Sequence, residues 1–148
     1  MAANQRPKRL WVVTVMNVAI GLIGIATVGF LLKSSKIPAE AVPATWSATL
    51  SILSAMTLIS ASILALLGLR RTRWFALVTA VAYFGIILVH NLLIYVDPQA
   101  IFGQPISDRD SRKLLAAVIR SSIEIGINVW AYLSVKTGAF FRPLGQLP

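Results

Sequence analysis

The chain has 148 residues, of which 57% are hydrophobic and 13% are charged, and its mean hydropathy is +0.76. Soluble domains are about one-quarter charged, so this composition indicates a protein embedded in lipid. There is no cysteine and a single histidine, which excludes disulfides, thiol catalysis and a two-histidine haem or metal site within one chain. The net charge of +9 lies in short clusters between apolar runs. That pattern is typical of membrane flanks, not of a nucleic-acid-binding surface.

Four segments are long and apolar enough to cross a membrane as helices, which requires about 20 residues each. They cover residues 10–32, 46–69, 74–96 and 114–135. The first three contain no Asp, Glu, Lys or Arg, and the fourth contains two charged residues. We therefore predict an all-α membrane protein in which residues 1–148 form a single domain. Its four transmembrane helices are expected to pack as an antiparallel up-down bundle with short loops.

The connections between the predicted spans are short. Residues 70–73, with the sequence Arg-Arg-Thr-Arg, are expected to link the second and third spans. Residues 97–113 form the longest loop, in which a short interfacial segment is expected at about 98–103 because Pro98 suits a first helical position.

The fourth helix has recognisable start and stop signals. Ser107, with Asp110 three residues later, resembles a capping box, so this helix is expected to begin near Asp108. Gly138 is a candidate C-terminal stop. The Phe140-Phe141-Arg142 sequence that follows is predicted to be an interfacial anchor.

The distribution of lysine and arginine predicts the orientation, because cytoplasmic flanks carry the excess of these residues. One side holds eight of them: Arg6, Lys8, Arg9, Arg70, Arg71, Arg73, Lys136 and Arg142. The other side holds five: Lys33, Lys36, Arg109, Arg112 and Lys113. Both termini are therefore expected in the cytoplasm. The size of the chain and its lack of targeting signals favour the plasma (inner) membrane of a bacterium.

Polar residues gather on one face of the third and fourth spans. At helical spacing, Arg120, Glu124 and Asn128 share a face of the fourth span, and Tyr83 and His90 share a face of the third. A charge at mid-bilayer costs about 2.5–3.5 kcal/mol on insertion scales. The face with the two charges must therefore point at other helices or at water.

Depths along the spans, counted from their ends, predict which polar residues meet. Asn17 and Asn128 each lie seven residues from a cytoplasmic span end, so they are expected to meet across the bundle. His90 and Arg120 each lie six residues from an outer end, with Glu124 one turn deeper.

Small residues give two other spans faces that suit close helix packing. On the first span these are Gly21 and Gly24, and on the second they include Ser51 and Ser54. We assign all four to helix packing. The alternative for the glycines, an ion path, stays open.

No catalytic motif, metal-ligand cluster or phosphate-binding glycine loop is present, so no cofactor and no metal are expected. The leading hypothesis is a non-enzymatic protein that acts through helix–helix association. It would be an accessory or assembly subunit of a larger membrane complex, or a homo-oligomer. Its expected partners are the lipid bilayer and other membrane-protein subunits or a second copy of itself, with no nucleic acid. A membrane enzyme is the least favoured reading.

The alternative hypothesis is a small proton- or cation-coupled transporter or channel. Intramembrane ionisable residues often mark transport pathways, and here they are Glu124, Arg120 and His90. Three further residues would line the path: Tyr83, Asn17 and Asn128. On the structural alternative, Arg120 and Glu124 form a neutral pair and His90 is a hydrogen-bonded structural residue.

The arginines between the second and third spans, Arg70, Arg71 and Arg73, are interpreted chiefly as orientation determinants. A patch that binds anionic lipid or an acidic partner is the alternative.

Overall fold

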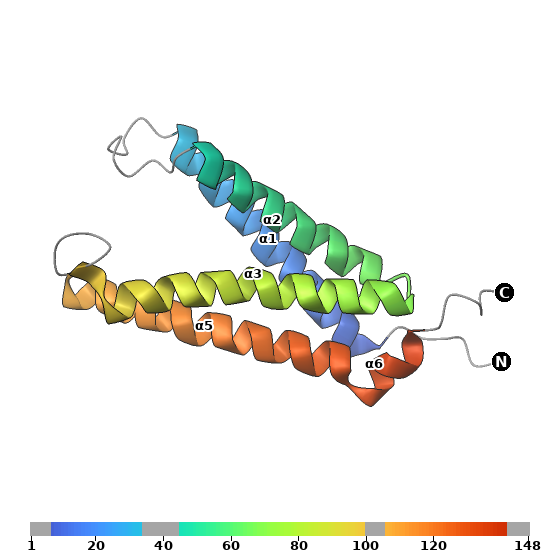
Figure 1. Cartoon of the computed structure of the whole chain (residues 1–148). Coiled ribbons are helices and arrows are strands. Elements are labelled where there is room, and N and C mark those ends of the chain that lie inside the picture. The colour runs from blue at the N-terminus through green and yellow to red at the C-terminus, as the bar shows by residue number, and fades with distance from the viewer. Residues whose placement is uncertain (1–6, 34–44, 100–105, 142–148) are drawn as a thin grey trace.

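The computed structural model describes residues 7–33, 45–99 and 106–141, and all the elements in these ranges are helices (Figure 1). They are α1 (Lys8–Lys33), α2 (Thr45–Ala65), α3 (Arg70–Val96), α5 (Asp108–Leu133) and α6 (Val135–Phe140). The predicted all-α class is confirmed. Most of the interfacial segment predicted at 98–103 lies outside the described residues.

Four of these helices, α1, α2, α3 and α5, are long and apolar enough to cross a membrane. Their outward faces carry large apolar side chains that are mostly exposed, such as Phe30 at 66%, Trp46 at 70% and Val78 at 62%. Contiguous apolar surface on this scale suits lipid and not water. The sequence and the structure therefore agree on a membrane protein with four candidate spans.

The helices are arranged as two pairs. α1 packs along α2 and α3 packs along α5, while contacts between α2 and α3 join the pairs. Figure 1 shows that the pairs come together at the end that carries α6 and separate toward the other end. We call these the closed end and the open end. The open end is formed by the C-terminal parts of α1 and α3 and the N-terminal parts of α2 and α5.

The main hydrophobic core fills the closed end. Four alanines, which let the helices approach closely, lie among six larger side chains. Its buried members are Leu10, Val13, Ala61, Ala65, Ala76, Leu77, Ala131, Tyr132, Phe140 and Phe141. The guanidinium of Arg9 on α1 also stacks over the ring of Trp130 on α5, 4.2 Å from the ring centroid.

The predicted interfacial anchor is wrong for Phe140 and Phe141, and Arg142, its third member, lies outside the described residues. Both side chains are buried, at 9% and 6% exposure, and their rings meet edge to face with centroids 5.4 Å apart. The reason is α6, which turns the chain back over the closed end and places these rings in the core.

The link between α2 and α3 differs from the prediction. α2 ends at Ala65, and the turn that follows contains Gly68 with φ +74°, a left-handed conformation that glycine adopts without strain. A Cβ at Gly68 would also lie 3.0 Å from the ring of Phe140. Because the turn comes this early, the arginines at 70–73 form the first turn of α3 and are not the link itself.

The end of α5 also differs from the prediction. α5 stops at Leu133 with Ser134 as its cap, and Ser134 then caps α6 by accepting a hydrogen bond from the backbone N–H of Thr137. Gly138 is therefore not the helix stop but lies inside α6. Arg73 packs against this glycine, because a Cβ added to Gly138 would lie 3.4 Å from Nη1 of Arg73.

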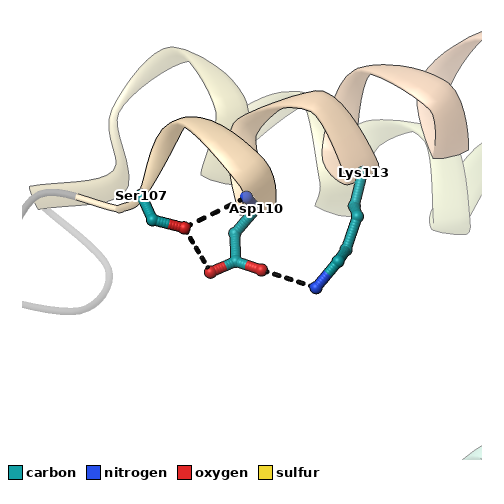
Figure 2. A network of polar contacts seen from close by, with 3 residues as sticks. All are labelled: Ser107, Asp110 and Lys113. Atoms are coloured by element: carbon teal, nitrogen blue, oxygen red, sulfur yellow. Dashed lines mark hydrogen bonds and ion pairs between the residues drawn. The ribbon is translucent and has the colours of Figure 1, made fainter.

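The start of α5 is confirmed at Asp108, next to the predicted cap (Figure 2). The hydroxyl of Ser107 accepts from the backbone N–H of Asp110 at 3.2 Å and donates to the Asp110 carboxylate at 2.7 Å. Lys113 pairs with the other oxygen of that carboxylate at 2.8 Å. In a standard capping box the acidic side chain bonds the cap's backbone N–H, whereas here the shorter Asp110 bonds the cap hydroxyl.

Candidate functional site

A cavity of about 540 Å³ lies between the two helix pairs, and all four long helices line it. α1 supplies Ile20, Ile23, Gly24, Thr27 and Val28, α2 supplies Ser51 and Ser54, α3 supplies Tyr83, Ile86 and Ile87, and α5 supplies Arg120 and Glu124. We call this the interhelix cavity. Its walls are mainly apolar, with a few polar groups, which is the usual composition of a small-ligand site.

Glu124 is the acidic group of the interhelix cavity. It lies in the middle of α5, and its side chain is 12% exposed. The Nε of Arg120, one turn earlier, is 3.6 Å from Oε1 of Glu124, which is longer than an ordinary hydrogen bond of about 2.7–3.2 Å. The Arg120 side chain is 71% exposed, so the two charges form a loose pair at the cavity surface and not a sealed internal one.

Three hydroxyl groups of the cavity wall donate their protons to their own helices. Thr27 donates to the carbonyl of Ile23 at 2.8 Å. Ser51 donates to the carbonyl of Ser47, and Ser54 to that of Ser51, both at 2.9 Å. Each hydroxyl oxygen keeps lone pairs for another donor.

Tyr83 on α3 and Gly24 on α1 both line the cavity and lie in close contact with each other. A Cβ added to Gly24 would lie 3.1 Å from the Tyr83 hydroxyl oxygen, so glycine leaves the room that this hydroxyl occupies. The Tyr83 ring meets the buried ring of Phe84 edge to face, with centroids 5.3 Å apart. Tyr83 is thus held by packing on one side and opens to the cavity on the other.

A buried hydrogen-bond network lies toward the closed end from the cavity. Asn17 Nδ2 donates to Asn128 Oδ1 at 2.9 Å and to Ser62 Oγ at 3.0 Å, and Asn128 Nδ2 donates back to Asn17 Oδ1 at 3.2 Å. The Thr14 hydroxyl donates to the Ser62 carbonyl at 3.3 Å. The predicted meeting of Asn17 and Asn128 is therefore confirmed. Both side chains are fully buried and neither lines the cavity.

The network is joined to the acidic group through the backbone. Asn128 Nδ2 also donates to the backbone carbonyl of Glu124 at 2.9 Å, one helical turn away. The bonds from Asn17 on α1 to Asn128 on α5 link the two helices, and they help to fix the rotation of α5 that places the Glu124 side chain in the interhelix cavity.

His90 does not join the other predicted site residues. Its side chain is exposed and lies in another surface groove, which shares Ile86 with the cavity and is lined by α3 alone: Ala82, Gly85, Ile86, Val89 and Leu93. The expected grouping of His90 with Arg120 and Glu124 is thus absent. Residues that share a face of one helix still need a neighbouring helix opposite them, and none of the described helices other than α3 lines the groove that holds His90.

The four residues assigned to helix packing divide into two kinds. A Cβ on Gly21 would lie 2.7 Å from Ile59 Cγ1 and 3.2 Å from the Ala55 carbonyl oxygen, so Gly21 is a contact point between α1 and α2. Gly24, Ser51 and Ser54 instead line the cavity.

The arginines that begin α3 also have different surroundings. Arg70 and Arg71 are exposed, whereas Arg73 is half-buried and its Nε donates to the Tyr132 carbonyl at 2.7 Å. That carbonyl belongs to the last turn of α5, where carbonyls lack partners within the helix. Arg73 is therefore a structural cap, which the sequence pattern did not reveal because the two residues are 59 positions apart.

Within the described ranges, no three His, Cys, Asp or Glu residues lie together in a way that could hold a metal ion. Comparisons with protein-family models, curated proteins and solved structures found no match. The interhelix cavity is therefore the feature of this structure that bears on function.

Proposed function

We propose that this protein is a small membrane transporter that carries a cation through the interhelix cavity, with Glu124 as the group that binds it. In this proposal the four long helices cross the membrane as an antiparallel bundle with both termini in the cytoplasm. The membrane would be the plasma membrane of a bacterium. The observation that carries the proposal is a single carboxylate in the middle of α5 that lines a cavity formed by all four helices.

The difference between the two ends supports a carrier. The closed end is filled by the hydrophobic core and the Asn17–Asn128 network, and the cavity lies where the pairs separate. Many transporters expose a central site to one side at a time by rocking one helix bundle against another. Rocking of α1 and α2 against α3 and α5 would provide such a movement. Arg120, loosely paired with Glu124, would release the carboxylate when the cation arrives.

The assembly-subunit hypothesis has less support. It relied on small-residue faces, yet the contact point at Gly21 is already filled by Ile59 of the same chain. Lipid chains can cover the remaining apolar surface as well as a protein partner can, so this surface does not favour a partner.

Currents from proteoliposomes on a solid-supported membrane test the proposal. Rapid addition of H⁺, Na⁺, K⁺ or phenethylammonium is expected to give a transient current for at least one of these cations. Glu124→Gln should abolish that current. His90→Gln also replaces an ionisable residue of a long apolar helix, but it lies outside the cavity and should preserve the current. Currents that are equal in wild type and Glu124→Gln for every cation, or no current at all, would overturn the proposal.

A further inference from the structure

The chemistry of the interhelix cavity indicates what kind of cation fits it, and this inference rests on the proposed function. The hydroxyl protons of Thr27, Ser51 and Ser54 are all used by backbone carbonyls of their own helices. What these groups offer a ligand is therefore oxygen lone pairs. Together with the Glu124 carboxylate they form an acceptor face, which suits a ligand that brings its own N–H donors, while the Tyr83 hydroxyl and the Arg120 guanidinium are the donors of the same wall.

The carboxylate of Glu124 has unused hydrogen-bonding capacity. An ionised carboxylate offers about four lone-pair sites. In the described part of the chain, its nearest charged partner is Arg120 at 3.6 Å, and no hydrogen bond reaches its oxygens. An ammonium group placed in the cavity would satisfy these oxygens without breaking an existing hydrogen bond.

The size and walls of the cavity argue against a bare metal ion. A cavity of about 540 Å³ holds many times the roughly 30 Å³ share of one water molecule. Apart from Arg120 and Glu124, much of its wall is isoleucine and valine: Ile20, Ile23, Val28, Ile86 and Ile87. A divalent metal ion takes about six or more oxygen ligands, whereas the lining residues offer one carboxylate, that of Glu124, and four hydroxyl oxygens, with the Arg120 charge beside the carboxylate.

We propose that the interhelix cavity binds an organic ammonium ion, with the charged nitrogen at Glu124 and an apolar body against the isoleucine and valine side chains. Thr27, Ser51 and Ser54 accept further N–H bonds at the cavity wall. Arg120 opposes a second positive charge nearby, so a monocation is favoured over a polyamine.

Binding to the full-length protein in nanodiscs tests this inference separately from transport. Three probes share a phenyl body and differ in charge: phenethylammonium, 2-phenylethanol and 3-phenylpropanoate. Equilibrium dialysis against protein-loaded and empty nanodiscs measures each affinity. We expect phenethylammonium to bind tightest. Glu124→Gln should weaken its binding about 10- to 100-fold, the range expected for hydrogen bonds to a charged group, and leave 2-phenylethanol unaffected.

Two further variants keep the result interpretable. His90→Gln should bind phenethylammonium like the wild type, because His90 lies outside the cavity. Thr27→Val removes one acceptor without changing the charge and should weaken phenethylammonium binding several-fold. This variant tests the inference if Glu124→Gln does not fold.

Three outcomes would overturn the inference: no binding of phenethylammonium, equal binding of all three probes, or affinity unchanged in both Glu124→Gln and Thr27→Val. The proposed function can fail independently. Phenethylammonium binding without any Glu124-dependent current would reject transport and keep the ligand assignment. A Glu124-dependent current for Na⁺ or K⁺ without phenethylammonium binding would keep transport and reject the ligand assignment.

Discussion

Asn17 and Asn128 lie 111 residues apart in the chain and exchange two amide hydrogen bonds, at 2.9 and 3.2 Å. The pair joins α1 to α5, and Ser62 of α2 accepts a third bond from Asn17. Both side chains are fully buried, and along α1 and α5 they lie between the closed end and the residues that line the cavity. This polar contact therefore holds three helices together on the closed side of the cavity.

Asn17→Ala is expected to lower the free energy of unfolding by about 1–2 kcal/mol, because it leaves the Asn128 amide buried without its partner. The double variant Asn17→Leu with Asn128→Leu should recover part of this loss, since neither polar group then remains. Reversible unfolding in bicelles measures both changes. Stability equal to the wild type in Asn17→Ala would show that the pair contributes nothing.

Gly21→Ala and Gly29→Ala should have effects of opposite sign. The added methyl at Gly21 would meet Ile59 at 2.7 Å, and overpacking of this kind costs about 1–3 kcal/mol. Gly29 has nothing within 4 Å of an added Cβ, so alanine there should stabilise the helix by up to about 1 kcal/mol. Thermal unfolding in the same detergent compares the two. The same shift in both variants would contradict close packing at Gly21.

Arg73→Gln is expected to loosen α6 and the last turn of α5, because it removes the donor to the Tyr132 carbonyl. Arg71→Gln is the matched control, since Arg71 is an exposed arginine in the same turn. Hydrogen exchange of the segment from 132 to 141, followed by mass spectrometry, should rise in the first variant alone. An equal rise in both would show a general effect of charge and not the loss of a cap.

The interhelix cavity is expected to be wet, which single cysteines can report because the chain has none of its own. Ser54 lines the cavity, whereas Met56 on the same helix is exposed on the apolar outer surface. In liposomes, a charged methanethiosulfonate reagent should modify Ser54→Cys about tenfold or more faster than Met56→Cys, because only a hydrated thiol forms the reactive thiolate. Similar rates at both positions would indicate a dry cavity.

The sequence by itself determined the four long helices and one of the contacts between them. Long apolar runs must satisfy their backbone groups internally in lipid, so helix formation follows from local composition. The start of α5 followed from Ser107 and Asp110, which act within one turn. Equal depth along two spans was enough to match Asn17 with Asn128, because helical rise is regular.

Only the tertiary structure decided how the faces of these helices are used. Periodicity shows that Tyr83 and His90 share a side of α3, but the separation of the helix pairs and the packing of α5 place only Tyr83 in the cavity. Phe140 is buried by the return of α6 over the closed end, and Arg73 caps α5 because α3 packs along α5. The physical reason is that side-chain packing joins segments far apart in the chain, and no pattern within one helix specifies which neighbour it meets.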